Sequence, residues 1–206
     1  MEYNVEKGGG RMRVFLTDLN ISQEDAERLV AALPLSQATR AKSLGATVGF
    51  HLVRYALRQT APEVAKLPWQ IRRGGKPCLP AGAPYFNLSH SNHGVAVVLS
   101  DREEVGIDLE EIRPHALRLA ERFYSESEQA AVSAAKDPQS ELIRIWSAKE
   151  AEAKRLGTGL GNRIAEIPID GVAAICVELD GKPHWLSVSP ATAMPHIEWI
   201  TADLLL

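Results

Sequence analysis

The sequence predicts an α+β fold of two packed lobes that meet near residue 105. In each half of the chain, segments with helical periodicity accompany short apolar strands, in similar order. The 206 residues, 45% of them hydrophobic, suffice for one large domain or two small ones with a shared core. We therefore expect an N-terminal lobe over 1–104 and a C-terminal lobe over 105–206.

Each element of the first half has its own signal. The glycine triplet at 8–10 indicates that residues 1–11 form a flexible leader, and the apolar run Arg13–Leu19 predicts the first strand. Ser22, with an acid three residues later, predicts the start of a helix, and apolar spacing predicts a second helix over 37–59. WQIRR, YFNLSHS and VAVVLS are predicted strands, with a turn at 92–94.

The second half follows this pattern after the strand GIDLE. Helices are predicted over about 116–123, 127–135 and 140–156, and GTGLGN ends the last of them. The strands AAICVELD, HWLSVS and HIEWITADL follow, and GKP at 181–183 is typical of a plain hairpin turn. Three helices and a small sheet are thus expected in the C-terminal lobe.

Composition excludes several functional classes. A net charge of -3 and a pI near 6.1 do not suggest a nucleic-acid-binding protein. No apolar run approaches the roughly 18 residues of a membrane span, and the N-terminus lacks the apolar core of a signal peptide. Cys78 and Cys176 lie outside zinc or disulfide spacing. We expect a cytoplasmic protein without nucleic-acid or membrane partners, in which local Lys and Arg residues hold any anionic ligand.

The stretch VGIDLE is the first candidate for chemistry. Strand side chains alternate between faces, so the apolar residues at 105, 107 and 109 form one row, and Gly106, Asp108 and Glu110 share the other face. Two acids on one face fit either a strand end that enters solvent or a metal site. In the second case, Gly106 would leave room for a phosphate ligand.

The stretch WSAKEAEAK is the second candidate. At 3.6 residues per turn, Trp146, Glu150 and Lys154 lie on one helical stripe. A Glu–Lys pair at this spacing is usually an exposed pair of little energetic value, but the large aromatic residue argues that this face is covered. Beside the GIDLE strand, Glu150 would add a third carboxylate to Asp108 and Glu110, a donor set that suits Mg²⁺.

Two further segments offer groups for an anion. GGKPCLP places Lys76 in a turn constrained by glycine and proline, although such turns are equally common on plain surfaces. NLSHS carries Ser89 and His90, which are either donors to an anion or part of a capping turn. Neighbouring serine and histidine residues cannot form the nucleophile–base pair of a hydrolase triad. Lys149 and Lys154, near the carboxylates, would also fit a phosphate.

With these segments in this order, the chain resembles the Sfp-type 4′-phosphopantetheinyl transferases. The matching strings are GKP, NLSHS, VGIDLE, RFYSESE, WSAKEAEAK and KRLGTGL, over roughly residues 70–161. The resemblance implies two similar α/β lobes related by a pseudo-twofold axis, with the active site between them. It also implies transfer of the phosphopantetheine arm of coenzyme A to a serine of an apo acyl, peptidyl or aryl carrier protein, with release of adenosine 3′,5′-bisphosphate.

The resemblance also assigns roles to residues. Asp108, Glu110 and Glu150 would hold Mg²⁺ against the pyrophosphate, and Lys149 and Lys154 would neutralise charge there. We expect Glu150 to accept the serine proton, directly or through a metal-bound water, with Asp108 and Lys154 completing the catalytic set.

The nucleotide end of coenzyme A would be held by Lys76, Ser89 and His90. The usual basic position for the 3′-phosphate reads GATVG here and is neutral, so Arg40 and Lys42 are expected to take this role. A weaker grip on the 3′-phosphate would allow dephospho-coenzyme A as a substrate. Glu128 matches an acidic position that borders the site in the family, and a plain helix N-terminal acid is the alternative.

Two other functions remain open at this point. A Mg²⁺-dependent pyrophosphate hydrolase would use the same carboxylates and lysines on coenzyme A without a carrier serine. A non-catalytic homologue would only bind carrier proteins. We expect a monomer, and we expect Arg113, Arg118 and Arg122 either to meet an acidic carrier protein or to be simply solvated.

Overall fold

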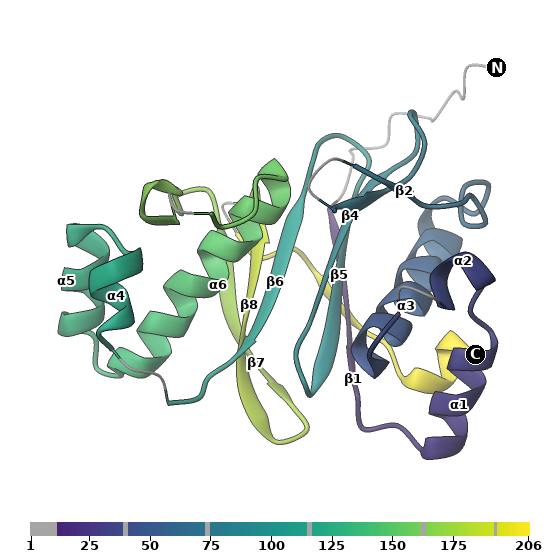
Figure 1. The fold of residues 1–206 in the computed structure, drawn as a ribbon, viewed down its shortest axis with the longest axis horizontal. Helices are drawn as coiled ribbons and strands as arrows, with labels where there is room; N and C mark the ends of the chain where they lie inside the picture. The colour runs from purple at the N-terminus through teal and green to yellow at the C-terminus, as the bar shows by residue number, and fades with distance from the viewer. Residues whose placement is uncertain (1–11, 39–40, 73–74, 115–116, 162–163, 192) are drawn as a thin grey trace.

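The computed structural model describes residues 12–38, 41–72, 75–114, 117–161, 164–191 and 193–206. It confirms a mixed α+β fold, with a four-stranded sheet, a three-stranded sheet and a two-stranded ribbon. Helices α1 to α3 lie at one end of the molecule, α4 to α6 lie at the other, and the two larger sheets lie between them (Figure 1).

The four-stranded sheet has the order β4-β5-β1-β9. Its members are β1 (Arg13–Asp18), β4 (Tyr85–His90), β5 (Gly94–Ser100) and β9 (Ile197–Trp199). β5 pairs antiparallel with both β4 and β1, and the β4–β5 connection contains the turn predicted at 92–94. β5 is buried along its whole length because both faces of the sheet are covered.

The helices of the first half are α1 (Gln23–Ala31), α2 (Leu35–Ala38) and α3 (Leu44–Thr60). Ser22 caps α1 as predicted, because its side chain accepts a hydrogen bond from the Asp25 N–H. The single helix predicted over 37–59 is wrong at its start. Ser43 accepts from the Ala46 N–H and caps α3, so α2 is a separate short turn of helix.

The three-stranded sheet has the order β6-β8-β7, from β6 (Gly106–Glu111), β7 (Ala173–Leu179) and β8 (Lys182–Ser189). Asp180 and Gly181 join β7 to β8 with φ angles of 49° and 66°, which is the hairpin turn expected there. The ribbon pairs β2 (Gln70–Ile71) with β3 (Pro77–Cys78) and carries the GKP turn.

The second half contains α4 (Leu119–Phe123), α5 (Glu126–Ala134), α6 (Pro138–Leu156) and the 3₁₀ turn η1 (Ile164–Glu166). α6 ends at Gly157, whose φ of 69° is left-handed. α6 packs so closely on β6 that a Cβ on Gly106 would lie 1.9 Å from the Ala151 carbonyl oxygen. Gly106 therefore makes room for the helix backbone, and the expectation that it clears space for pyrophosphate is wrong.

One core joins the two larger sheets. Val14, Leu16 and Val98 from the first sheet pack with Ile107 and Leu186 from the second. A separate core lies between the other face of the first sheet and α3. The apolar row of the GIDLE strand thus lies in the inter-sheet core, as its alternation predicts.

The chain returns to the first half at its end. β9 runs parallel to β1, and Leu205 in the 3₁₀ turn η2 (Ala202–Leu205) joins the core beneath α3. These last residues therefore do not follow the expected division at residue 105. None of the helices in the described ranges has both the length and the apolar character of a membrane span.

Candidate active site

Alternate residues of β4, and Ser91 directly after it, make polar contacts between the two halves. Asn87, Ser89 and Ser91, here called the seam, share one face because strand side chains alternate. Asn87 Oδ1 accepts a hydrogen bond from the Ile107 N–H at 3.0 Å, and Ser89 Oγ donates to Asp108 Oδ1 at 3.0 Å. The NLSHS string thus bonds directly to the GIDLE string, which lies on the neighbouring edge strand β6.

The last residue of the seam contacts a fully buried histidine. His184 Nδ1 lies 2.9 Å from the Lys182 carbonyl oxygen, so this nitrogen carries the proton, and Nε2 accepts from the Ser91 hydroxyl at 3.0 Å. Ser91 Oγ in turn accepts from the backbone N–H groups of His93 and Gly94. Burial lowers the pKa of His184, in agreement with a neutral ring.

Asp108 lies at the centre of the candidate site and is 2% exposed. The Lys154 ammonium lies 2.6 Å from Asp108 Oδ1 and 3.0 Å from Ser89 Oγ, so the assumed proximity of strand and helix is confirmed. The second oxygen, Asp108 Oδ2, is buried and has no hydrogen-bond partner among the residues that the structure describes. A buried carboxylate oxygen without a partner is a position for a cation or a water.

Two more carboxylates lie close enough to interact with Asp108 electrostatically. Burial, followed by the charges of Asp108 and Glu150, raises the pKa of Glu110 to about 7. Burial and Asp108 also raise the pKa of Glu150, against the effect of the Lys154 ammonium. Within the described ranges, no group of three His, Cys, Asp or Glu side chains is already arranged to hold a metal ion. The donor types and mutual repulsion nevertheless fit a divalent cation.

A cavity of about 250 Å³ lies beside this cluster, between the GKP turn, β4 and the end of α6. Lys76 and Lys154 both line it. The Lys76 ammonium lies 2.8 Å from Glu104 Oε2, 2.9 Å from the Val105 carbonyl oxygen and 3.3 Å from that of Arg155. Burial lowers the pKa of Lys76, although Glu104 opposes this effect. Lys76 therefore joins the turn to both β6 and α6 at the cavity wall.

His90 lies at the start of α3. A Cβ on Gly45, in the first turn of that helix, would come within 2.8 Å of His90 Cγ. Partial burial and the Lys154 charge lower the pKa of His90. Lys42 is exposed just before α3, and Arg40 lies outside the described residues.

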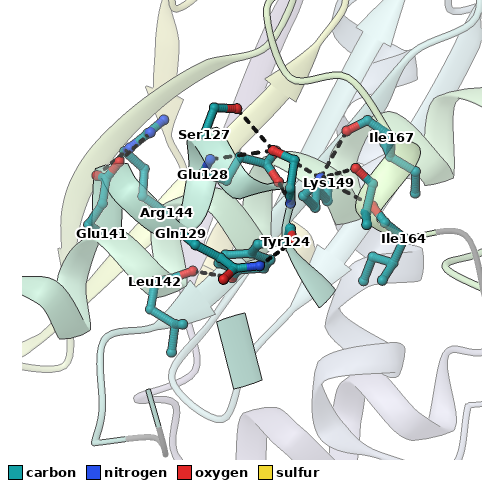
Figure 2. A network of polar contacts seen from close by, with 12 residues as sticks. Tyr124, Ser127, Glu128, Gln129, Glu141, Leu142, Arg144, Lys149, Ile164 and Ile167 are labelled. Carbon is teal, nitrogen blue, oxygen red and sulfur yellow. Dashed lines mark hydrogen bonds and ion pairs between the residues drawn. The ribbon is translucent and has the colours of Figure 1, made fainter. Parts of the chain in front are cut away.

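Lys149 does not join the carboxylate cluster. Its side chain is completely buried, and its ammonium donates to the carbonyl oxygens of Ile164 and Ile167 at 3.1 and 3.0 Å, with Ala165 at 3.4 Å (Figure 2). Its counter-charge is Glu128 Oε1 at 2.8 Å. The geometry does not support the expected contact of Lys149 with pyrophosphate, because these protein groups already take its donors.

Glu128 also has a local role. It forms a capping box with Ser125, in which each side chain bonds the other residue's backbone N–H at the start of α5. Of the two alternatives for Glu128, the structure favours the helix N-terminal acid, which here also neutralises Lys149.

A second cavity, of about 360 Å³, opens on the far side of Glu110. Its walls are mainly apolar and come from α4 and α6, with Phe123, Tyr124 and Trp146 among them. Glu110 and Arg113 are its charged lining residues. The predicted stripe of Trp146, Glu150 and Lys154 therefore runs from this apolar cavity past the carboxylates.

Sequence reasoning missed four residues of this region: Asn87, Ser91, Glu104 and His184. The period-two spacing of Asn87, Ser89 and Ser91 was a usable signal for the seam. No sequence signal links Ser91 to His184, since the two are 93 residues apart.

Comparison with known proteins shows the family of this chain. A model of the 4′-phosphopantetheinyl transferase superfamily matches residues 104–190. The 4′-phosphopantetheinyl transferases ffp and Sfp of Bacillus subtilis are each 30% identical over 176 residues, which cover 80% of this chain and 75% of each relative. The 4′-phosphopantetheinyl transferase AcpT of Salmonella typhimurium is 46% identical over 89 residues, 40% of this chain and 46% of that relative. The chain belongs to the 4′-phosphopantetheinyl transferase superfamily.

Proposed function

We propose that this protein transfers the 4′-phosphopantetheine arm of coenzyme A to a serine of an apo carrier protein and releases adenosine 3′,5′-bisphosphate. The names of its relatives support this activity. The observation that carries the proposal is the buried Asp108 carboxylate, with Lys154 and Ser89 on one oxygen and no partner within the described chain on the other.

The proposal includes two α/β lobes related by a pseudo-twofold axis, with the active site between them. Contacts across the two halves support this position for the site: Ser89 to Asp108, and Lys76 to the Arg155 carbonyl oxygen. The cavity between the GKP turn and the end of α6 lies along the same boundary.

We assign Mg²⁺ to Asp108, Glu110 and Glu150. The unpartnered Asp108 Oδ2 and the raised pKa of Glu110, at about 7, support this, because crowded carboxylates readily take up a proton or a divalent cation. When bound, Mg²⁺ would neutralise negative charge on the pyrophosphate.

The nucleotide half of coenzyme A is assigned to the cavity lined by Lys76 and Lys154. Ser89 borders it through its bond to Lys154, and His90 lies over the first turn of α3. Lys42, exposed before that helix, is assigned to the 3′-phosphate together with Arg40. A phosphate suits this region because Lys154 lines the cavity and because a phosphate can replace Glu104 as a partner of Lys76, whose other donors meet the Val105 and Arg155 carbonyl oxygens.

The pantetheine arm is assigned to the apolar cavity beyond Glu110. An arm in this cavity and a nucleotide in the first one would place the pyrophosphate beside Asp108. Arg113 lines this cavity, and Leu117 and Leu119 are exposed nearby at 43% and 38%. Together with the exposed Arg118 and Arg122, they offer an acidic carrier protein a basic and apolar surface.

In the proposed reaction, the carrier serine Oγ bonds to the phosphorus that bears the pantetheine arm. The bond from this phosphorus to the bridging pyrophosphate oxygen breaks, and adenosine 3′,5′-bisphosphate leaves with that oxygen. The serine proton passes to Glu150, directly or through a water, since its carboxylate belongs to the cluster around Asp108. Lys154 offsets charge on the leaving group.

Mass spectrometry of an apo carrier protein incubated with coenzyme A and Mg²⁺ tests the proposal. We expect the carrier mass to increase by one phosphopantetheine, in step with release of adenosine 3′,5′-bisphosphate. Consumption of coenzyme A without any carrier would indicate the pyrophosphate hydrolase instead. Carrier binding without either product would indicate the non-catalytic homologue. A panel of acyl, peptidyl and aryl carrier proteins would identify the pathway that this enzyme serves. That the protein is a cytoplasmic monomer stays a prediction.

A further inference from the structure

We infer that Lys149 is a positioning residue for the arm of coenzyme A. It fixes the wall that α4 and Tyr124 give to the apolar cavity beside Glu110, and so affects binding of the arm but not of the nucleotide. This inference rests on the proposed function, in which that cavity receives the arm.

The network begins with the anchoring of Lys149 itself. The carbonyl oxygens of Ile164 and Ile167, at the start of η1 and directly after it, point at its ammonium at 3.1 and 3.0 Å (Figure 2). The Ala165 carbonyl oxygen lies 3.4 Å from it. η1 is a single turn, in which the Ile164 oxygen also accepts from the Ile167 N–H, and Lys149 adds a donor to all three carbonyls. With Glu128 at 2.8 Å, α6, η1 and the start of α5 are held at one point.

A series of hydrogen bonds links Glu128 to the cavity wall. Glu128 Oε2 accepts from the Ser125 N–H at 2.8 Å, directly after Tyr124, which is the last residue before the α5 cap. Gln129 Nε2 donates to the Tyr124 carbonyl oxygen at 2.9 Å, and the Tyr124 hydroxyl donates to the Leu142 carbonyl oxygen at 2.5 Å. The Lys149 ammonium also lies 5.9 Å from the centre of the Tyr124 ring.

Aromatic side chains form the part of the cavity wall that this network holds. Tyr124 and Phe123 both line the cavity, and the Phe123 ring meets Trp146 edge-on at 5.9 Å. Trp146 lies on α6, three residues before Lys149, and Phe123 ends α4 directly before Tyr124, so the contacts around Lys149 hold both residues of this pair. Loss of the Lys149 anchor would free α4 and the start of α5, and would therefore widen the cavity at Phe123 and Tyr124.

The test is a comparison of two ligands in steady-state kinetics. We expect Lys149→Met to raise the KM for coenzyme A roughly tenfold, with kcat changed less, because binding of the arm is lost. Inhibition by adenosine 3′,5′-bisphosphate, which lacks the arm, should stay within about twofold of the unchanged enzyme. Lys136→Met, at an exposed lysine between α5 and α6, is the matched control and should alter neither value.

Glu128→Gln provides a second variant if Lys149→Met does not fold. Glutamine keeps the capping hydrogen bond but removes the counter-charge of Lys149, so a smaller shift of the same kind is expected. Equal weakening of coenzyme A and of adenosine 3′,5′-bisphosphate would overturn the inference and restore a direct phosphate contact. An unchanged KM in either folded variant would also overturn it. Failure of the unchanged enzyme to modify any carrier would instead refute the proposed function.

Discussion

Two lysines on α6 show how one motif can contain residues with opposite roles. Lys154 is 29% exposed at its side chain, contacts Asp108 and Ser89, and lines the cavity between the halves. Lys149 is 0% exposed and donates to three backbone carbonyls and to Glu128. Five residues at 3.6 per turn place these two side chains about 140° apart around the helix.

The difference between them lies in what surrounds each ammonium. Around Lys149, the partners are the Glu128 carboxylate and backbone carbonyls in and just after the single turn η1, so this lysine stabilises the fold. Around Lys154, the partners are a carboxylate and a hydroxyl from two strands that meet at the site. A lysine in this motif is therefore assigned a role by the groups it faces, and residue type alone does not distinguish the two.

The largest expected effect is on the Lys154 side of the helix. We expect Asp108→Ala to reduce transfer to a carrier protein by about a thousandfold or more, since it removes the carboxylate at the centre of the cluster. Glu111→Ala is the matched control: its carboxylate points toward His93, at 3.7 Å, and activity should stay within about threefold. Comparable losses of transfer activity in both variants would mean that only the negative charge of β6 matters, and not the face of the strand on which each carboxylate lies.

A direct comparison of the two lysines comes second. Lys149→Met should lower the free energy of unfolding by about 3 kcal/mol, because it takes the ammonium away from Glu128, 13% exposed at its side chain, and from three backbone carbonyls. Lys154→Met should lower it by a similar amount, since Asp108, 3% exposed at its side chain, then keeps only the Ser89 hydroxyl within the part of the chain that the structure describes. The two variants should therefore differ in transfer to a carrier protein, which Lys154→Met reduces far more. Urea unfolding followed by circular dichroism measures both free energies of unfolding, and mass spectrometry of the carrier measures transfer. An equal loss of transfer in the two variants would contradict the roles given to the two lysines.

The buried side chain of His184, which accepts a hydrogen bond from Ser91 of the seam, is expected to make the stability of the fold depend on pH. His184 has a pKa below its ordinary 6.5 because of burial and nearby His93, against the Lys182 carbonyl and Glu111. Between the folded pKa and about 6.5, the unfolded chain binds the proton and the fold does not, so stability falls as pH falls through that window. As pH falls over the same range, the His184→Gln variant should lose less of its free energy of unfolding than the unchanged protein does. Thermal unfolding between pH 7 and pH 5 measures both slopes, and parallel slopes would exclude His184 as the cause.

The smallest expected effect concerns a third lysine, Lys42. It is exposed, so its grip on a 3′-phosphate should be worth only about fivefold in kcat/KM. Dephospho-coenzyme A should therefore serve as a substrate within about tenfold of coenzyme A. Lys42→Ala should lower kcat/KM for coenzyme A and leave kcat/KM for dephospho-coenzyme A unchanged, so the difference between the two substrates becomes smaller. A gap of a hundredfold or more would require a stronger 3′-phosphate contact than Lys42 can supply.

Local patterns predicted most of the elements and the central cluster. The alternation in VGIDLE predicted which residues enter the inter-sheet core, and Ser22 marked a helix start, because both signals depend on near neighbours in the chain. The combination of Asp108, Glu110, Glu150 and Lys154 followed from strand and helix periods once the two elements were assumed to pack together.

Contacts between distant segments limited the rest. The sequence pattern predicts that Gly106 and Lys149 both serve a phosphate ligand. In the structure, Gly106 lies against the Ala151 carbonyl, and Lys149 donates to carbonyls of η1. Backbone carbonyls carry no sequence signal, so a side chain that serves them resembles one that serves a ligand. The helix start at Ser43 is also hard to predict, since this capping residue lies within a continuous pattern of apolar spacing.

The parallel pairing of β9 with β1 has a consequence for how the protein is made. Val14 has its strand partner at Ile197, almost the full length of the chain away. During synthesis, the first sheet keeps an open edge at β1 until β9 has left the ribosome, and such an edge invites pairing with other chains. Closure of this sheet is therefore non-local, and a nascent chain would depend on it for protection from aggregation.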